Sequence, residues 1–323
     1  MSTDATGTME VRAEEFRTVY GQVKAEIAKV IVGHDEIVAG VLTCLFVGGH
    51  ALLEGVPGLG KTLLVRTLAD AISLDFNRIQ FTPDLLPTDI LGASIYNQRT
   101  QEFVVHKGPI FTNILLADEI NRASPRTQSA LLEAMGEGQV SLEGQKFPLA
   151  HPYFVIATQN PIEFHGTYPL PEAQMDRFAL RLALGYVSVA DEVAIIAANN
   201  ARSPLLDLVP VINIEEVRNF QSAAAAIAVS AELKTYLVTL VAATRGLPAL
   251  ELGASPRASL ALLKCAQALA LFDGLDFVTP DLIQELAPLV LSHRLALRAE
   301  ARFSGASTAT LIAELLDTVP VPR

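Results

Sequence analysis

The sequence predicts an α/β fold with a parallel sheet in its first part, followed by a small all-helical domain. The first observation is that short apolar runs alternate with helical stretches between residues 50 and 184, as buried parallel strands and their connecting helices do. The second is that these runs stop near residue 188, where Ala- and Leu-rich helical stretches take over. Half of the 323 residues are hydrophobic and 18% are charged, so most of the chain should fold.

The first expected element is an amphipathic helix over about residues 11–32, whose apolar residues recur at three- and four-residue steps. Residues 1–10 are polar, and we expect them to form a flexible N-terminal tail. They contain no basic segment followed by an apolar core, so no secretory signal is expected. The expected location is therefore cytoplasmic.

Five apolar runs are expected to form the strands of the sheet. They are 51–54, 76–81, 114–118, 153–158 and 178–184. Two further segments, 93–105 and 139–149, place apolar residues on both sides of a polar turn, as β-hairpins do. Because both fall between elements of the sheet, we expect two β-hairpin insertions that project from it.

The second part of the chain is expected to be helical throughout. Its helices are expected at 189–201, 213–227, 231–246, 256–272, 279–297 and 307–318. A loop between Pro204 and Pro210 lies near the start of this part. We therefore expect the tail (1–10), an α/β core (11–186) and an all-helical domain (187–323), in line with the roughly two domains that the length predicts.

The composition excludes several classes of protein. A formal charge of −11, from 35 acidic and 24 basic residues, disfavours a nucleic-acid-binding surface, because neutralising phosphates needs clustered Lys and Arg. The longest uncharged run, 37–53, is about 17 residues long and contains glycines and a histidine, so no membrane insertion is expected. Cys44 and Cys265 have no paired spacing, so we expect buried thiols and no metal other than magnesium.

Residues 55–62 match the P-loop pattern G-x-x-x-x-G-K-[ST], between an expected strand and an expected helix. A chain of this composition would produce the match by chance roughly 0.003 times. In such a loop the glycines let backbone N–H groups surround a phosphate, Lys61 reaches the β- and γ-phosphate oxygens, and Thr62 binds Mg²⁺. A dinucleotide-binding loop does not fit, because Leu63 stands where its third glycine is required.

Two acidic residues, Asp118 and Glu119, come at the end of another expected strand. Asp118 is expected to hold hydrated Mg²⁺, and Glu119 to polarise the attacking water. The strand at 153–158 leads to Asn160, whose amide could orient that water. An Asn that precedes a proline also fits a simple turn, so both interpretations of Asn160 stay open.

Five longer strings resemble the MoxR family of AAA+ ATPases, and the resemblance extends over about residues 12–318. They are FTPDLLPTD at 81–89, LADEINRA at 116–123, LLEAM at 131–135, YPLPEAQMDRF at 168–178 and GASPR at 253–257. The resemblance implies an AAA+ core with a helical lid, ATP and Mg²⁺ as cofactors, and hydrolysis of ATP to ADP and phosphate. It also implies a ring, usually hexameric, with ATP bound between neighbouring subunits.

The resemblance also implies roles for individual residues. Arg177 matches the arginine finger, which acts in trans on the neighbouring subunit's ATP, and Arg257 matches the sensor-2 arginine, which reports the nucleotide to the lid. From the residues alone, Arg177 also fits a surface ion pair. In relatives a Gln commonly follows the glycine at position 33, where this chain has His34. The residues expected to contact the nucleotide are Val32, Gly33, Gly55, Pro57, Gly58, Leu59, Gly60, Lys61, Thr62, Leu63, Asp118 and Arg257, with Thr62 and Asp118 holding Mg²⁺ through water.

For partners, the resemblance implies chaperone-like action on protein clients, often together with a protein that carries a von Willebrand factor A domain. The two hairpins resemble the insertions of the helix-2-insert group, which face the ring's channel or a partner. Tyr96, Phe103 and Phe147 would then touch a client, although strand aromatics also serve packing. Arg122 and Arg126 fit either a position facing the neighbour's phosphates or a role as solvated charges.

Two alternative functions fit the sequence less well. A magnesium-chelatase-like motor subunit shares the insertions and the von Willebrand factor A partner, but the strings around Arg122 and Arg177 favour the MoxR family. A nucleic-acid translocase also carries such insertions, but the charge of −11 and the scarcity of Lys and Arg clusters in the hairpins disfavour it.

Overall fold

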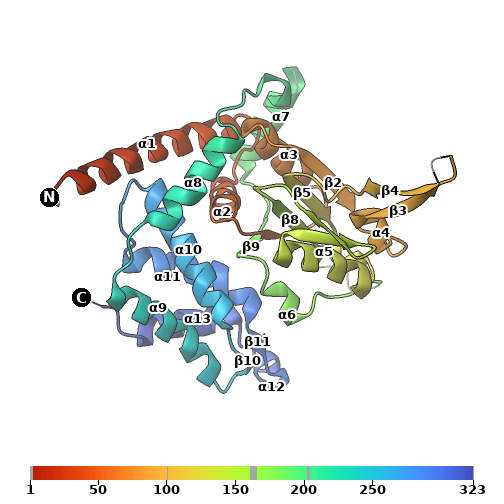
Figure 1. Cartoon of the computed structure of the whole chain (residues 1–323). Helices are drawn as coiled ribbons and strands as arrows, with labels where there is room; N and C mark the ends of the chain where they lie inside the picture. The colour runs from red at the N-terminus through yellow and green to blue at the C-terminus, as the bar shows by residue number, and fades with distance from the viewer. Residues whose placement is uncertain (1–2, 100, 161–165, 202–203, 323) are drawn as a thin grey trace.

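A five-stranded parallel sheet lies at the centre of the N-terminal half of the chain (Figure 1). The computed structural model describes residues 3–99, 101–160, 166–201 and 204–322. Each neighbouring pair of strands in the sheet is parallel, which confirms the predicted sheet and its five strands. The strands lie in the order β2 (Phe76–Gln80), β5 (Ile114–Asp118), β8 (Phe154–Gln159), β1 (Ala51–Glu54) and β9 (Leu180–Ala183).

The register aligns the carboxyl ends of the strands. Glu54 at the end of β1 pairs with Gln159 of β8, and Gln80 of β2 pairs with Asp118 of β5. Because the strands of a parallel sheet run in one direction, the loops that follow them leave at the same edge. The segments after β1, β5 and β8, which carry most of the predicted site residues, therefore begin side by side.

Helices cover both faces of the sheet, as its apolar strands require. In β5, Ile114 and Leu116 belong to the buried cluster on one face, whereas Leu115 and Ala117 belong to the cluster on the other. This alternation is the two-residue period of a strand that is buried on both sides. The helices of the first cluster include α1 (Thr3–Ala28), α2 (Asp35–Phe46) and α3 (Lys61–Ala71), and the second cluster includes α5 (Pro125–Glu137).

Helix α1 begins at Thr3, so it takes up residues that were expected to form a flexible tail. It also ends earlier than predicted, at Ala28. Its later turns pack on α2 and α3, with Val23 and Ile27 fully buried. Once such turns are anchored, each residue added to the helix gains a backbone hydrogen bond without a new nucleation step, so polar residues can extend it.

Both predicted β-hairpins are present. The first pairs β3 (Gly92–Asn97) with β4 (Glu102–Lys107) and projects away from the sheet (Figure 1); Thr100 of its expected turn lies outside the described residues. Gly92 is required where this hairpin leaves the body, because a Cβ there would stand 2.1 Å from the His106 carbonyl oxygen. The second pairs β6 (Gln139–Leu142) with β7 (Gln145–Pro148), and short helical turns complete this half: α4 (Pro87–Leu91), η1 (Ile120–Arg122) and α6 (Glu172–Met175).

The C-terminal half is helical, as predicted, with one addition. The predicted helix over 279–297 ends at Leu291, because the chain then turns and becomes extended to pair β11 (Ala296–Leu297) with β10 (Leu250–Leu252). Among the described helices, none combines the length and apolar character needed to cross a membrane. The helices are α7 (Val189–Ala201), η2 (Pro204–Asp207), α8 (Ile214–Ala226), α9 (Ala231–Ala243), η3 (Thr244–Gly246), α10 (Pro256–Phe272), α11 (Pro280–Leu291), η4 (Ser292–Arg294), α12 (Ala299–Phe303) and α13 (Thr308–Thr318).

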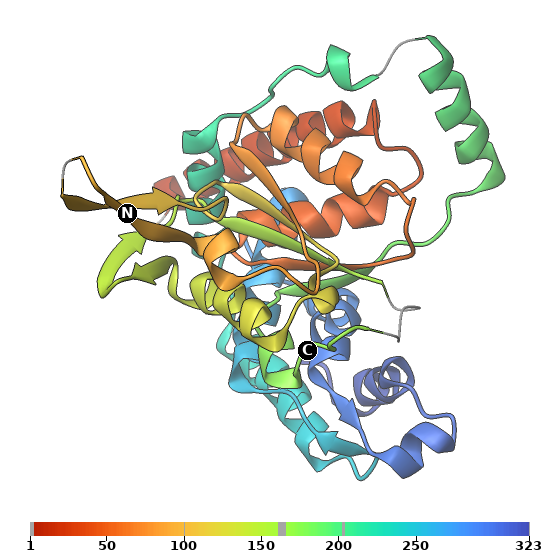
Figure 2. The same cartoon turned by 90° about the vertical axis from the view of Figure 1, so that its right-hand side faces the viewer.

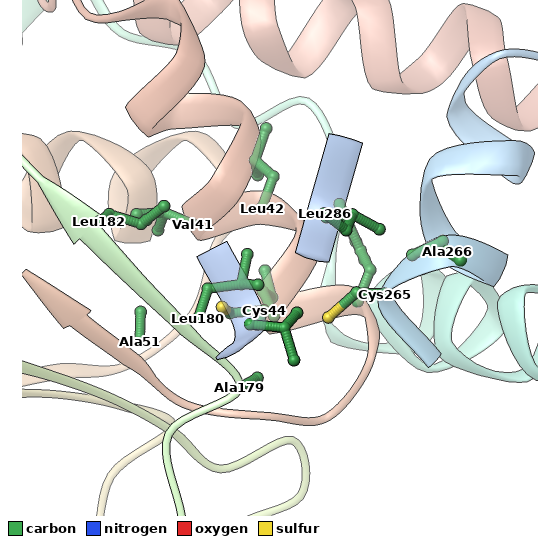
Figure 3. Close-up of a cluster of buried hydrophobic side chains, with 14 of the residues drawn as sticks. Val41, Leu42, Cys44, Ala51, Ala179, Leu180, Leu182, Cys265, Ala266 and Leu286 are labelled. Atoms are coloured by element: carbon green, nitrogen blue, oxygen red, sulfur yellow. The ribbon is translucent and has the colours of Figure 1, made fainter. Parts of the chain in front are cut away.

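The C-terminal helices share a core with the first face of the sheet. Figure 3 shows Leu180 of β9 among side chains of α2, α10 and α11, including Cys44, Cys265 and Leu286. Both cysteines are free and buried, as predicted, and burial raises the pKa of each thiol well above its ordinary value. The position of α10 against α2 determines where the start of α10 lies, and therefore where Arg257 lies.

Candidate nucleotide site

The P-loop connects β1 to α3, as the sequence predicts. Gly58 and Gly60 have φ angles of 88° and 80°, in the left-handed region that side chains with a Cβ rarely adopt. Gly55 is required for a different reason, because a Cβ there would stand 2.9 Å from the carbonyl oxygen of Leu184. The loop shape therefore depends on three glycines, two through backbone conformation and one through close packing.

A hollow of about 440 Å³ opens beside this loop, a size suited to a small-molecule ligand. Among the predicted contact residues, Val32, Gly58, Leu59, Gly60 and Leu63 line it. The other P-loop positions expected to contact the nucleotide lie next to these in the chain. They are Gly55, Pro57, Lys61 and Thr62.

The linker between α1 and α2 forms one wall of the hollow, where the sequence places the base of the nucleotide. His34 and Val32 line the hollow, and Gly33 lines an adjoining one together with Val32. Gly33 has a φ of 78°, and a Cβ there would come within 2.9 Å of the Asp191 carboxylate. The positive φ favours glycine at this position, where the linker approaches α7.

The opposite wall comes from residues that sequence reasoning missed. Tyr186 and Val187 line the hollow from the segment that leads into α7, and Glu192 and Ile195 line it from α7 itself. Figure 2 shows α7 on the outer side of this region, apart from the main body of helices. Val187 precedes α7 and Ile195 lies within it, so no helical spacing in the sequence links the two residues.

Lys61 is the first residue of α3, and only 8% of it is exposed. Its Nζ donates to the carbonyl oxygen of Gly55 at 2.7 Å, so the ammonium group lies against the P-loop backbone. Thr62 follows it at the start of the helix and is half-buried. A buried ammonium group and the N–H groups of a helix start are the groups that a phosphate binds.

Asp118 is the last residue of β5 and is buried. Its Oδ1 accepts a hydrogen bond from the Thr158 hydroxyl at 2.6 Å, and its Oδ2 accepts one from an Arg78 guanidinium nitrogen at 2.7 Å. The Thr62 hydroxyl and the Asp118 carboxylate supply the hard oxygen donors that Mg²⁺ prefers, so these residues fit the expected ion. Arg78 was not anticipated, because its position opposite β5 depends on strand order.

Glu119 follows directly, in the left-handed region with a φ of 57° and a ψ of 48°. This conformation is rare for a side-chain-bearing residue and is held here by the N–H of Glu119, which donates to the Thr158 hydroxyl. The carboxylate accepts hydrogen bonds from Gln80 at 2.9 Å and from Arg122 at 3.0 Å. Arg122 is thus paired with Glu119 of its own chain, whereas Arg126 is exposed at the start of α5.

Asn160 follows the end of β8, the strand next to β5, and is 5% exposed. The structure therefore places Asn160 and Glu119 after neighbouring strand ends. The proline after Asn160 lies outside the described residues.

Arg177 and Arg257 lie together in a second hollow, of about 470 Å³. Lys264 and Arg294 line it as well, so four cationic side chains border one space. Neither Arg177 nor Arg257 belongs to the described residues that line the P-loop hollow. The start of α10, which carries Arg257, lies beside Arg177 because α10 packs on α2 and α8.

Comparisons with known proteins agree with this geometry. Residues 50–180 match the family described as "ATPase family associated with various cellular activities (AAA)", and residues 242–315 match "AAA lid domain". YeaC of Bacillus subtilis, described as uncharacterized, is 48% identical over 96% of this chain and 97% of its own length. The chaperone MoxR1 of Mycobacterium tuberculosis is 45% identical over 92% of this chain and 81% of its own.

More distant and structural relatives lead to the same family. The protein MoxR of Methylorubrum extorquens is 28% identical over 95% of this chain and 96% of its own length. A crystal structure described as a candidate ATPase from Cytophaga hutchinsonii is 41% identical, with a TM-score of 0.91 over 99% of both chains. With its P-loop, its parallel sheet and its helical lid, this chain belongs to the MoxR family of AAA ATPases, enzymes that hydrolyse ATP.

Proposed function

We propose that this chain hydrolyses ATP at sites shared between copies of itself in a ring, and uses the resulting movements to remodel or activate other proteins. One observation supports the shared site most directly. The P-loop hollow and the hollow that holds Arg177 and Arg257 are lined by different residues of the same chain. A site that needs both must combine the P-loop of one copy with the arginines of the next.

Within one chain, the P-loop residues would bind the triphosphate. The backbone N–H groups at the start of α3 and the Lys61 ammonium group would hold the β- and γ-phosphates. Thr62 and Asp118 would hold Mg²⁺ through water, and when bound the ion neutralises charge that develops on the phosphates. The base would lie between the α1–α2 linker, with Val32 and Gly33, and the segment that leads into α7.

Glu119 would activate the attacking water, and Asn160 would help to orient it. In the structure Gln80 and Arg122 both donate to Oε2 of the Glu119 carboxylate, so a proton from water would be accepted by the other oxygen, Oε1. The pairing of Arg122 with Glu119 also means that Arg122 would have to leave this carboxylate before it could face a neighbour's phosphates.

Arg177 would stabilise the charge that develops on the transferred phosphoryl group in the neighbouring copy. Arg257, the proposed sensor-2 arginine, would contact the same phosphoryl group, since it borders the same hollow as Arg177. In related phosphoryl-transfer enzymes, an arginine supplied in trans accelerates hydrolysis by about three to five orders of magnitude. The ring is proposed to be a hexamer. Within each chain, the boundary between the core and the lid is proposed to lie near residue 186.

The partner class is proposed from the family. The relative MoxR1 is described as a chaperone, which supports chaperone-like action on protein clients here. A protein with a von Willebrand factor A domain is the proposed co-partner, and the cytoplasm the proposed location. The β3–β4 hairpin supports contact with another protein, because Tyr96 and Phe103 are 48% and 71% exposed near its end.

The experiment that tests the shared site combines two inactive chains. Lys61→Ala should lose nucleotide binding, and Arg177→Ala should bind nucleotide but hydrolyse it slowly, about 100-fold or more below the parent. Mixed before assembly, the two chains should regain a measurable part of the parental ATPase rate, because some interfaces pair an intact P-loop with an intact Arg177. If the mixture is no more active than the two variants measured apart, Arg177 does not act in trans.

A further inference from the structure

Asp176 connects two parts of the chain that lie far apart in the sequence. It directly precedes Arg177, and its carboxylate is bonded by two groups of the lid. Arg294 of η4 donates from Nε to Oδ1 at 2.8 Å, and the Ser255 hydroxyl donates to Oδ2 at 2.7 Å. Both carboxylate oxygens are therefore used to attach the segment of Arg177 to the lid.

Arg294 holds more than the carboxylate of Asp176. Its side chain is 2% exposed, and its guanidinium group also donates to the carbonyl oxygens of Asp176, Phe178 and Ala179. The neighbouring His293 ring lies 3.1 Å from the Phe178 carbonyl oxygen. The backbone on both sides of Arg177 is thus bonded to η4, while the side chain of Arg177 remains half-buried beside the second hollow.

Such an arrangement is costly, which suggests that it serves a purpose beyond stability. Burial lowers the pKa of Arg294, while its hydrogen bond with Asp176 acts in the opposite direction and favours the charged form. A buried ion pair is a poor source of folding free energy, because desolvation of both charges offsets their attraction. Its strength is geometric, since an arginine with several fixed acceptors can hold a segment in one position.

Ser255 extends the connection to the second arginine. It is the N-cap of α10, and its Oγ accepts a hydrogen bond from the backbone N–H of Arg257 at 3.1 Å. A hydroxyl group can accept this bond while it donates its own hydrogen to Asp176. One carboxylate thus links the backbone next to Arg177 with the helix start that carries Arg257.

We propose that Asp176, Arg294 and Ser255 are positioning residues that fix Arg177 and Arg257 relative to each other, so that both guanidinium groups reach one anion. That anion is the terminal phosphate group of ATP held by a neighbouring copy, so the inference rests on the proposed function. It adds that the finger and the lid arginine move as one unit. A nucleotide of the neighbouring copy that binds Arg177 would therefore also move the lid of the chain to which Arg177 belongs.

The direct test is Asp176→Asn, which keeps the size of the side chain but removes its charge. A small misplacement of a catalytic group can cost about 100-fold in rate. We expect kcat for ATP to fall by roughly 10- to 100-fold, while the dissociation constant of the chain's own P-loop for a fluorescent ATP analogue changes by less than about 2-fold. A fold that was merely weakened would lower kcat and raise the dissociation constant together. A parental kcat, or a rise of the dissociation constant that matches the fall of kcat, would therefore overturn the proposal.

A milder pair of variants decides the question if Asp176→Asn does not fold. Ser255→Ala removes the bond to Asp176 together with a helix cap, and Ser255→Thr restores a hydroxyl group. Ser307→Ala is the matched control, because Ser307 caps α13 in the same manner but has no bond to Asp176 among the described contacts. We expect kcat to fall at least about 5-fold further in Ser255→Ala than in Ser307→Ala, and to recover in Ser255→Thr. Equal kcat in the two alanine variants would overturn the proposal.

A combined variant separates positioning from an independent role. If Asp176 acts only through Arg177 and Arg257, then adding Asp176→Asn to the double variant Arg177→Ala/Arg257→Ala should not slow hydrolysis further. A multiplied loss would overturn the proposal. Failure of the proposed function looks different, because Arg177→Ala would then hydrolyse ATP at the parental rate. If Arg177→Ala is slow while the Asp176 and Ser255 variants are as fast as the parent, only the present inference fails.

Discussion

At the scale of single residues, several polar side chains are buried because their hydrogen bonds are complete. His50 at the entrance of β1 is the clearest case, since it is 7% exposed. Its Nδ1 accepts the N–H of Val155 at 3.1 Å, and its Nε2 lies 3.3 Å from the carbonyl oxygen of Met135. Both contacts fit a neutral ring with its proton on Nε2, and burial lowers the pKa of His50 to about 4.

This geometry predicts a loss of stability in mild acid. The ordinary pKa of a histidine is 6.5, so below that pH the unfolded chain binds a proton at His50 that the folded chain does not bind. Stability is therefore complete above pH 6.5 and falls between pH 6.5 and about 4, by roughly 1 kcal/mol per pH unit from this group. Urea unfolding should be measured at pH 6.5 and 5.5. Between these pH values the free energy of unfolding of His50→Gln should fall less than that of the parent, by about that amount. The exposed His106→Gln serves as control, and an unchanged loss in His50→Gln would contradict the assignment.

At the scale of elements, the β3–β4 hairpin exposes several apolar side chains together. Tyr96 and Phe103 face each other across the two strands, with ring centroids 5.2 Å apart, and Ile95 is 53% exposed. The aromatic pair contributes to the hairpin itself and buries little against the sheet. A projecting ribbon with apolar side chains suits contact with another protein better than it suits internal packing.

The double variant Tyr96→Ala/Phe103→Ala should therefore leave the ATPase rate within about 2-fold of the parent and the melting temperature within about 3 °C. It should lose proteins that co-purify in the presence of ATP with a Glu119→Gln background, in which turnover is expected to stop. Phe303→Ala is the matched control, because Phe303 is 93% exposed on α12, away from the hairpin. Co-purification that survives the double variant would exclude these aromatics as a client contact.

At the scale of the whole molecule, the sheet and the lid helices are joined by one hydrophobic core. Phe220 of α8 is 1% exposed and lies between two other rings, with centroids 4.5 Å from both Phe16 of α1 and Phe46 of α2. The P-loop hollow and the hollow of Arg177 and Arg257 therefore belong to one packed body. A change at one hollow can reach the other through rigid packing as well as through Asp176.

This shared core predicts that the two halves unfold together. Phe220→Ala should lower the free energy of unfolding by about 3 to 5 kcal/mol, because it leaves a cavity where three elements meet. Since the chain contains no Trp and six Tyr, tyrosine fluorescence and far-UV circular dichroism are suitable probes. Both should shift to the same lower midpoint, while Phe303→Ala shifts neither. A midpoint that moves in only one of the two probes would show that the halves unfold independently.

Much of the fold could be predicted because its signals are local. The P-loop, the five strands and both hairpins follow from short patterns: glycines before Lys61, apolar runs that end in Asp118, and a polar turn between paired strands. The ends of elements were less predictable. Whether α1 starts at residue 11 or at Thr3, and whether a helix continues past Leu291, depends on packing against distant segments.

The sequence by itself therefore determined the α/β class, the phosphate loop and the residues that end β1, β5 and β8. Only the tertiary structure decided which distant side chains meet. The ion pair of Asp118 with Arg78 requires that β2 and β5 lie side by side, and the contact of Asp176 with Arg294 joins residues that are 118 positions apart. It also decided that Arg257 lies beside Arg177 and not over the P-loop. The physical reason is that periodicity and turn chemistry act over a few residues, whereas contacts between elements depend on how whole helices and strands pack.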